Sequence, residues 1–360
     1  MSAQPAVEVD PVPEADEAAQ PAVLVTGSTG FLGKQVVAAA LRAGLRVRTV
    51  VRPGTDLASL PWRDHPLAEV ARVDLRRRAG LAEALEGCDT VVHLAATKTG
   101  DFAARFAGTV VATENLLAAM DTAGVRRLVH CSSFSVYESG ATPRHAVLDE
   151  SAPVESAPAA RDDYAQVKIV QERLVHEWAA AAEGRELTVL RPGLIYGPGE
   201  LWHSLLGVEV LPSLWLGAGL RSTLPMAWVE NVADAFVCAA AQHPLAGATV
   251  NLVDDRLPSI SRYARAVRPL VDGTPRIVQL GYPGARGVVA LAAAVNRRWL
   301  GGRLKLPGGL SPSPFEARFR PLRYSNQAAK DLLGWRPRYE FPETLQRAAT
   351  AAPAPERTGG

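Results

Sequence analysis

Two side chains able to move a proton stand four residues apart in the segment Tyr164-Ala-Gln-Val-Lys168. On a helix, residues at this spacing share a face, with Cβ atoms about 5 to 6 Å apart. A phenol has a pKa near 10 and is a poor base at neutral pH, so a neighbouring ammonium group favours its phenolate form. An exposed tyrosine and lysine on a helix is the alternative, and the pair alone does not exclude it.

A glycine-rich stretch, Thr26-Gly-Ser-Thr-Gly-Phe-Leu-Gly33, follows an apolar run at 22–25 and precedes an apolar-periodic stretch at 36–41. Its three glycines allow a tight turn, a close approach of backbone to a pyrophosphate, and packing of the helix on the strand. An ordinary strand-to-helix turn is the alternative, but the position favours dinucleotide binding. The expected cofactor contacts in this loop are Gly27, Thr29, Gly30, Phe31, Leu32 and Gly33.

The residue that would bind the adenosine ribose is expected about 20 residues beyond these glycines, at the end of the second strand. Arg52 stands there, where an acidic residue would favour NAD. An arginine can pair with a 2′-phosphate, so we favour NADP over NAD as the cofactor, with a solvated arginine as the equal alternative. Asp74 and Leu75, after the third predicted strand, are the candidates to contact the adenine, although Asp74 also suits a helix cap.

The elements that position these residues alternate along the chain. This alternation predicts βαβ units, right-handed crossovers and a doubly wound α/β fold with a parallel (Rossmann) sheet. Strand ends of such a sheet open onto one crevice, which brings Ser132-Ser133 near Tyr164 and strengthens the catalytic interpretation. The predicted strands are 22–25, 46–51, 68–73, 90–95, 127–131 and 187–190, and the predicted helices are 36–41, 81–85, 102–123 and 162–182.

The chain is expected to divide into a dinucleotide-binding Rossmann domain and a smaller C-terminal substrate-binding part. Apolar residues at 201–220 and 284–310 are candidates for a substrate pocket, with a core role as the alternative. The expected boundaries are a disordered tail at 1–20, the Rossmann domain at 21–192, the substrate-binding part at 193–348, with about 229–253 returning to the sheet, and a disordered tail at 349–360.

Composition narrows the class of protein. The net charge of +2, from 39 basic and 37 acidic residues, gives no reason to expect a nucleic-acid partner. Three scattered cysteines indicate neither a disulfide framework nor a metal site and favour a reducing, cytoplasmic setting.

The apolar run Val288–Val295 is far shorter than the roughly 20 residues that span a bilayer. We favour a core or substrate-pocket helix there; because Arg297, Arg298 and Trp299 follow, peripheral membrane contact near 288–300 is the alternative.

Taken together, the motifs resemble the extended short-chain dehydrogenase/reductases, the NAD-dependent epimerase/dehydratase family. The similarity covers about residues 22–348, and the motifs follow the family's order. Val51-Arg52-Pro53 and the apolar segment near 288–300 are most similar to the 3β-hydroxysteroid dehydrogenase-like and dihydroflavonol reductase-like branches. The motifs are Thr26–Gly33, His93-Leu-Ala-Ala96, Cys131-Ser-Ser-Phe-Ser-Val-Tyr137, Tyr164-x-x-x-Lys168, Arg191-Pro-Gly-Leu-Ile-Tyr-Gly-Pro-Gly199, Tyr324-Ser-Asn-Gln-Ala-Ala-Lys330 and Leu333-Gly-Trp-Arg-Pro337.

The resemblance implies a catalytic set of Ser133, Tyr164 and Lys168. Ser133 would hold the substrate oxygen, Tyr164 would act as general acid or base, and Lys168 would grip the nicotinamide ribose. A homodimer through the helices at 102–123 and 162–182 is a family-level expectation. The remaining expected cofactor contacts are Leu94, Ala95, Ala96, Pro192, Gly193 and Ile195.

Three positions depart from the family pattern. Thr109 stands where the family has an asparagine, which puts a structural or proton-relay role at that point in doubt. The usual Val-His-Val-x-Asp-Val-Ala becomes Ala227-Trp-Val-Glu-Asn-Val-Ala233, and Glu138 follows Tyr137 where glycine is common. None of these positions belongs to the catalytic set.

The favoured function is an NAD(P)-dependent oxidoreductase acting on a secondary alcohol or ketone of a small or lipid-like substrate. The alternative is a nucleotide-sugar epimerase or dehydratase with tightly held NAD, which shares the first hydride step. A non-catalytic dinucleotide sensor is a third hypothesis, and the presence of all three catalytic residues speaks against it.

Overall fold

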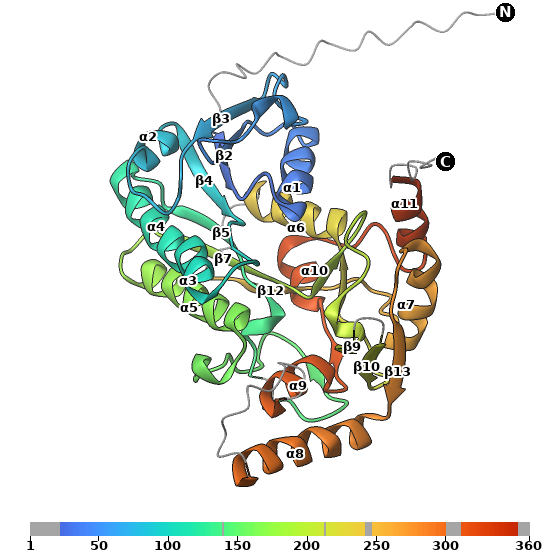
Figure 1. The fold of residues 1–360 in the computed structure, drawn as a ribbon. Coiled ribbons are helices and arrows are strands. Elements are labelled where there is room, and N and C mark those ends of the chain that lie inside the picture. The colour runs from blue at the N-terminus through green and yellow to red at the C-terminus, as the bar shows by residue number, and fades with distance from the viewer. Residues whose placement is uncertain (1–21, 139, 212–213, 242–246, 300–310, 352–360) are drawn as a thin grey trace, which may run out of the picture.

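The computed structural model describes residues 22–351, apart from 139, 212–213, 242–246 and 300–310. At its centre lies a seven-stranded sheet, all of whose neighbouring strands are parallel, in the order β12-β7-β5-β4-β1-β2-β3 (Figure 1). This is the doubly wound α/β fold that the alternation predicts. The strands are β1 (Ala22–Thr26), β2 (Val47–Val51), β3 (Ala68–Arg72), β4 (Cys88–His93), β5 (Arg127–Cys131), β7 (Glu186–Pro192) and β12 (Thr249–Leu252).

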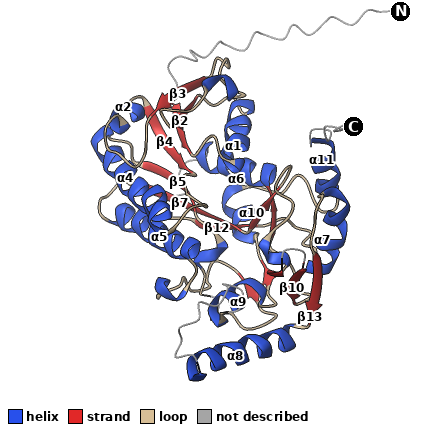
Figure 2. Cartoon of the chain, in the orientation of Figure 1, coloured by secondary structure: helices blue, strands red, loops and turns tan. Residues whose placement is uncertain are grey.

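Helices cover both faces of this sheet (Figure 2), and each face has its own apolar core. Successive residues of a strand point to opposite faces, so Val23 and Val25 of β1 enter one core and Leu24 enters the other. Burial on both faces explains why the strands read as near-continuous apolar runs. The helices of the first core are α1 (Phe31–Arg42), α6 (Val229–Ala241) and α10 (Gln327–Leu333), and those of the second are α2 (Leu81–Leu85), α4 (Ala112–Ala123) and α5 (Asp163–Ala180).

Beyond β7 the chain builds a smaller part around a core that includes Tyr196, Trp228 and Tyr263. It then rejoins the main sheet, because α6 packs on α1 and β12 pairs with β7. Short strands in this part form separate small sheets. The remaining elements are β6 (Val147–Leu148), β8 (Leu194–Tyr196), β9 (Val208–Leu211), β10 (Leu214–Ala218), β11 (Met226–Trp228), β13 (Arg276–Leu280), β14 (Arg323–Tyr324), α7 (Ile260–Val267), α8 (Tyr282–Trp299), α9 (Pro312–Phe319) and α11 (Glu343–Ala351).

The helix expected at 102–123 is interrupted by a π-helical turn. The structure has α3 (Phe102–Phe106), a π turn at Ala107–Val111, and then α4. A Cβ on Gly108 would lie 2.0 Å from the Thr97 hydroxyl oxygen, so this turn and the loop after β4 approach too closely for any side chain there. Apolar spacing does not reveal the inserted residue, because the helix continues on both sides of it.

The core or pocket interpretation of Val288–Val295 is wrong for one face of α8. Val288, Leu291 and Val295 are exposed, while the residues that pack inward lie on another face of the helix. A continuous apolar run covers every side of a helix, so the sequence cannot say which side is buried. At the chain end, residues 349–351 form the last turn of α11, although we expected them in the tail; the rest of the expected tails, 1–20 and 352–360, lies outside the described residues.

Within the region proposed as a substrate pocket, Leu201 and Leu206 are buried in the core of the smaller part. Trp202 packs edge-on against Trp215, with ring centroids 5.7 Å apart. Leu201 and Leu206, with Trp202 packed against them, therefore serve the core, as the alternative interpretation holds. Residues 300–310 of the second proposed segment lie outside the described residues.

A buried carboxylate, Asp254, ties the end of the chain to the start of α6. It accepts hydrogen bonds from the Trp228 amide at 3.0 Å, the Asn231 side chain at 2.8 Å and the Tyr196 hydroxyl at 3.1 Å. Asn231 in turn accepts from the backbone N–H of Tyr339 at 3.1 Å. Burial nevertheless raises the pKa of Asp254 to about 7, because the charged form loses its hydration.

This raised pKa predicts a pH-dependent contribution to stability. The folded protein keeps a proton on Asp254 that the unfolded chain releases near pH 4, so the stabilisation is complete below pH 4 and is lost as the pH rises towards 7. We expect Asp254→Asn to remove this loss. Its unfolding free energy relative to the wild type should increase between pH 4.5 and 7 by at most about 1.4 kcal/mol per pH unit. Urea unfolding across this range measures it, and a difference that does not change with pH contradicts it.

Candidate active site

The glycine-rich loop joins β1 to α1 at the carboxyl edge of the sheet. Gly27 has a φ of 68°, and a Cβ on it would lie 2.9 Å from the Ala95 backbone nitrogen. At Gly33 a Cβ would lie 2.1 Å from the Gly27 carbonyl oxygen, so α1 starts in direct backbone contact with the loop. Each of these two positions therefore requires glycine.

The N-terminus of α1 is open to an anion. Its N-cap is Gly30, which has no side chain to bond the first backbone N–H groups, and the first turn carries no acidic residue. These N–H groups and the helix dipole favour a negative group beside them. Thr29 and Gly30 are exposed at the loop tip, and Phe31 and Leu32 begin the helix. The loop thus has the form of a pyrophosphate site.

A buried threonine connects this loop to the end of β4. The Thr26 hydroxyl accepts hydrogen bonds from the backbone N–H groups of Leu94 at 3.2 Å and Ala95 at 3.3 Å, and lies 2.7 Å from His93 Nδ1. It fixes the neighbouring strand ends, with Ala96 directly after them. Burial lowers the pKa of His93 to about 3, so its ring is neutral at physiological pH.

The three residues of the expected catalytic set come together at the end of β5. Asp162 caps α5 by accepting a hydrogen bond from the Ala165 N–H at 3.1 Å, which places Tyr164 in the first turn. The nearby Ser133 side chain favours the phenolate of Tyr164, but burial dominates and raises the pKa of Tyr164 well above its usual value near 10. The phenol is therefore protonated at neutral pH.

Lys168 lies one turn further along α5 and is almost completely buried. Its ammonium donates to the Cys131 carbonyl at 2.5 Å and to Gln171 Oε1 at 2.6 Å. Burial lowers the pKa of Lys168, while the carboxylate of Glu172 acts in the opposite direction. The Cys131 carbonyl thus holds the ammonium at the end of β5.

Gln171 is a member of the site that the sequence analysis missed. Besides accepting from Lys168, its amide donates to Thr113 Oγ1 at 2.9 Å and to the Ala95 carbonyl at 3.2 Å. Thr113 also lies 2.8 Å from His93 Nε2. A continuous polar line therefore runs from Lys168 to the glycine-rich loop. The available signal was the spacing of three residues between Lys168 and Gln171, which places both on one helical face.

A buried ion pair lies directly behind the catalytic set. Arg191 Nε donates to Glu172 Oε2 at 3.1 Å, and Arg191 Nη2 donates to Glu172 Oε1. The Ser132 hydroxyl donates to the same carboxylate. Arg191 also stacks 4.8 Å over the ring of Tyr137, whose hydroxyl donates to Asn251 at 2.7 Å. These contacts join α5 to the ends of β5, β7 and β12.

The predicted nicotinamide-end residues lie where β7 leaves the main sheet. Pro192 ends β7, and a Cβ on Gly193 would lie 2.2 Å from the Pro225 carbonyl oxygen. Ile195 follows in β8, which pairs with β11. Glycine is therefore required where the chain crosses from one part to the other.

The predicted adenosine-end residues lie at the same edge of the sheet. Arg52 directly follows β2; its side chain is exposed and has no ion pair or hydrogen bond within the described part of the chain. Asp74 follows β3 and is held by Arg76 at 2.7 Å, which lowers the Asp74 pKa to about 2. Leu75 is half-buried, and its carbonyl accepts from Asn115 at 3.0 Å. Asp74 thus acts as a turn cap in this structure.

The three departures from the family pattern have structural explanations. The Thr109 hydroxyl lies in the π turn and accepts from the Thr97 N–H at 3.0 Å. Asn231 both donates and accepts in the Asp254 network, and an aspartate there cannot donate to a second carboxylate. The Glu138 side chain is exposed, and the Glu138 backbone N–H donates a hydrogen bond to the Pro153 carbonyl.

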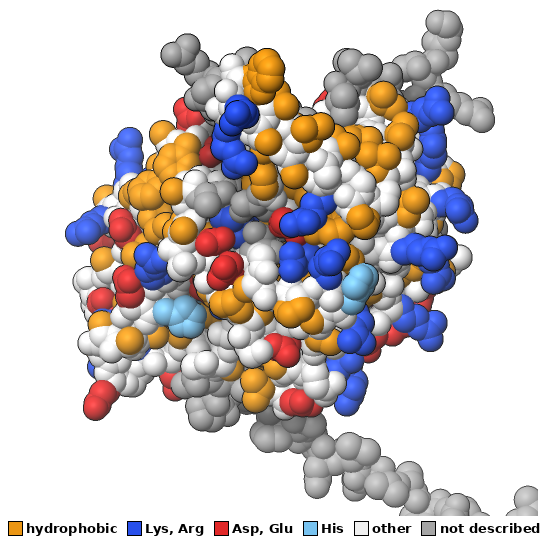
Figure 3. Space-filling model, turned by 90° about the horizontal axis from the view of Figure 1, so that it is seen from below, with side chains coloured by type: hydrophobic (Ala, Val, Ile, Leu, Met, Phe, Trp, Pro, Cys, Tyr) orange, Lys and Arg blue, Asp and Glu red, His pale blue; other side chains and the backbone are white. Residues whose placement is uncertain are grey.

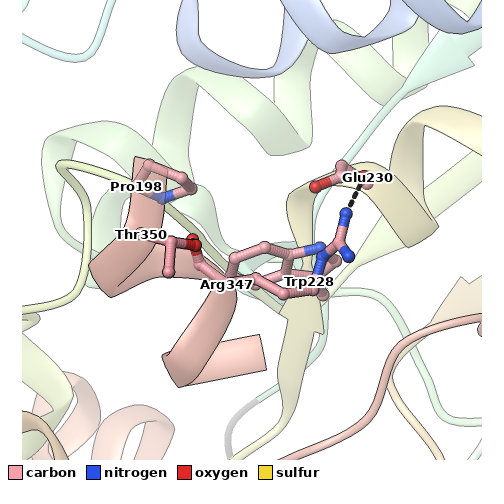
Figure 4. A pocket seen from close by; sticks show the side chains of 5 residues that line it. All are labelled: Pro198, Trp228, Glu230, Arg347 and Thr350. Carbon is pink, nitrogen blue, oxygen red and sulfur yellow. Dashed lines mark hydrogen bonds and ion pairs between the residues drawn. The ribbon is translucent and has the colours of Figure 1, made fainter. Parts of the chain in front are cut away.

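A separate pocket of about 320 Å³ lies beside α11, lined by Pro198, Trp228, Glu230, Arg347 and Thr350 (Figure 4). Arg347 reaches across it to Glu230 at 3.4 Å. None of the expected catalytic or cofactor-binding residues lines this pocket.

Comparisons with known proteins agree with this geometry. Residues 23–252 match the model of the NAD dependent epimerase/dehydratase family. The chain is 36% identical to sterol demethylase protein B of Methylococcus capsulatus, over 52% of this chain and 56% of that protein. It is 33% identical to a 3 beta-hydroxysteroid dehydrogenase/Delta 5-->4-isomerase of Mycobacterium tuberculosis, over 61% and 60%. The match thus spans less than two thirds of either relative.

Among solved structures, MoeE5 in complex with UDP-glucuronic acid and NAD shares the fold, with a TM-score of 0.64 and 23% identity over 91% of this chain and 98% of that one. With a family model covering most of the chain, a Rossmann sheet and a glycine-rich loop at its carboxyl edge, this protein belongs to the NAD-dependent epimerase/dehydratase family, the extended short-chain dehydrogenase/reductases.

Proposed function

We propose that this protein is an NAD(P)-dependent oxidoreductase that transfers a hydride between nicotinamide and a secondary alcohol or ketone carbon of a small or lipid-like substrate. The observation that carries the proposal is the convergence of Ser133, Tyr164 and Lys168 at the end of β5, on the sheet edge that also holds the glycine-rich loop. A steroid dehydrogenase among the relatives supports an apolar substrate.

The residues present fit a dinucleotide. The contact between Gly33 and Gly27 leaves no space for a side chain, and the uncapped N-terminus of α1 presents N–H donors. Gly27, Thr29, Gly30, Phe31, Leu32 and Gly33 would hold the pyrophosphate, with Leu94, Ala95 and Ala96 beside it and Pro192, Gly193 and Ile195 at the nicotinamide end. When bound, the nicotinamide supplies or accepts the hydride.

The chain's own residues would handle the proton. The half-buried, protonated Tyr164 is suited to donate a proton to a carbonyl oxygen, and Ser133 would hold that oxygen by a hydrogen bond. In the reverse direction the phenolate must form, and the nearby Lys168 ammonium favours it. Gln171 and the Cys131 carbonyl would keep Lys168 in place while it holds the ribose.

A nucleotide-sugar epimerase or dehydratase is the second candidate, because it uses the same first step and the solved structure of MoeE5 holds NAD with a UDP sugar. Net oxidation of free NADPH favours the oxidoreductase. Cofactor that stays bound through purification without net redox change favours the epimerase. A non-catalytic sensor would bind the dinucleotide and be indifferent to the substitution of Tyr164.

Two further expectations accompany the proposal. A homodimer through α3, α4 and α5 is consistent with the exposed rings of Phe102 and Phe106 on α3. A cytoplasmic location rests on the scattered cysteines. None of the described helices is long and apolar enough to cross a membrane.

We expect Tyr164→Phe to lower kcat for ketone reduction by about 10² to 10⁴, because the proton donor is lost while the ring remains. The affinity for NADPH should stay within a factor of two or so. A panel of hydroxysteroids and aliphatic ketones, with absorbance of the reduced nicotinamide as readout, measures it. Tyr263→Phe, which removes only a hydroxyl bonded to the Leu201 carbonyl, is the matched control. Unchanged turnover in Tyr164→Phe would overturn the mechanism.

Arg52 should set the preference between the two cofactors. Its free guanidinium can pair with a 2′-phosphate, so we expect NADPH to bind about tenfold or more tightly than NADH. Arg52→Asp should abolish or reverse that ratio. Titration of both cofactors into both proteins measures it, with Arg42→Asp, an exposed position at the end of α1, as control. Equal affinities in wild type and Arg52→Asp would show that no 2′-phosphate site exists here.

Gly33→Ala should abolish dinucleotide binding. The added Cβ would lie 2.1 Å from the Gly27 carbonyl oxygen, and α1 and the loop can separate only by distorting the pyrophosphate site. Gly287→Ala in α8 is the control, because its Cβ meets nothing within 4 Å. Calorimetric titration with NADPH, beside thermal unfolding of each variant, distinguishes lost binding from lost folding. Wild-type affinity in folded Gly33→Ala would refute the loop assignment.

A further inference from the structure

Helix α8 presents two apolar faces, of which only one is used in the fold. Tyr282, Ala285 and Val289 pack inward against α9, where Phe315 and Phe319 complete a small core, and Ala293 is also buried. A second set of apolar side chains points to solvent. This exposed stripe consists of Val288, Leu291, Val295 and Trp299, with exposed fractions of 49, 66, 44 and 80%.

The four residues of the exposed stripe recur every three or four positions, so they form one continuous line along the helix. In Figure 1, α8 runs along the lower edge of the molecule, outside the body of the smaller part. Single exposed apolar residues are common on protein surfaces, but a continuous stripe of large ones marks a binding surface. The inward face holds the helix in place, so the body presents the stripe in a fixed orientation.

The charges on α8 indicate the nature of the partner. The helix contains Arg286, Arg297 and Arg298 and no acidic residue. Arg286 is paired with Glu316 of α9 at 2.9 Å. Arg297 and Arg298 are exposed and have no acidic partner within the described part of the chain. The whole chain carries only +2, so the excess of positive charge at this helix end is local.

We propose that α8 is a peripheral membrane-binding helix that lies in the interface of an anionic lipid bilayer. The exposed stripe would enter the boundary between headgroups and acyl chains, Trp299 would anchor the helix end there, and Arg297 and Arg298 would meet anionic headgroups. Figure 3, which looks at the molecule from below, shows hydrophobic side chains on that side with basic and acidic side chains among them. An anionic membrane matches both the apolar stripe and the unpaired arginines, whereas a second copy of the stripe would bring like charges together.

This inference goes beyond the proposed function and does not depend on it, because vesicle binding is measured without cofactor or substrate. Purified full-length protein is mixed with vesicles of phosphatidylcholine alone or of phosphatidylcholine with phosphatidylglycerol, and the bound fraction is found by sedimentation. We expect at least about tenfold stronger binding to the anionic vesicles, declining as salt screens the arginines.

Leu291→Glu places a charge at the middle of the stripe and should lower vesicle binding by about tenfold or more. Leu332→Glu is the matched control, since Leu332 is 47% exposed on α10, away from α8. Replacing both Arg297 and Arg298 by glutamine should remove the preference for anionic vesicles but leave the fold intact, as circular dichroism and thermal unfolding check. A folded Leu291→Glu variant that binds vesicles as the wild type does would overturn the proposal, and so would self-association through α8 with no vesicle binding.

Discussion

The buried ion pair between Arg191 and Glu172 is the interaction on which the arrangement of the site depends. Arg191 lies near the end of β7, just before the chain leaves the sheet, and Glu172 lies on α5, one turn after Lys168. Two charges removed from water are stable together only if every remaining hydrogen-bonding position is filled. Here Ser132 fills a position on the carboxylate, and the ring of Tyr137 covers the guanidinium.

Because this pair spans two elements, it fixes the position of α5 against the sheet. Tyr164 and Lys168 then have only one way to face β5, and the polar line through Gln171 extends that placement to the glycine-rich loop. Glu172 has a second effect, since its charge partly compensates the burial of Lys168. A rigid connection of this kind is what hydride transfer needs, because a small misplacement of the reacting groups slows the reaction greatly.

Local signals predicted most of the Rossmann sheet. Strands buried on both faces appear in the sequence as short apolar runs. Glycines such as Gly124 mark the ends of the helices between them. The predicted bounds of α2 and β5 therefore match the observed ones. Motifs defined by local geometry were equally readable: Gly33 is required by its contact with Gly27 in the same turn, and Gly27 by its positive φ. The placement of Tyr164 and Lys168 followed from the spacing of four residues.

Long-range contacts were not readable in the same way. Gln171 looks like an ordinary helical residue until the fold brings Thr113 and Ala95 beside it. Asp254 and Asn231 lie far apart in sequence, and nothing local shows that they meet. The orientation of α8 depends on which face α9 covers, and this is a property of packing. The π turn lies where Gly108 approaches Thr97 closely, and this contact between distant segments cannot be seen in the sequence.

The network around Asp254 and Asn231 also limits how the molecule can move. The chain passes between the two parts at Gly193, again at Met226 and Asp254, and finally near Tyr339, and each passage is tied by hydrogen bonds to another. Several separated connections that are hydrogen-bonded to one another oppose the free hinge motion that a single flexible linker allows. We therefore expect motion to be confined to loops and side chains of the smaller part, while the two parts keep their spacing.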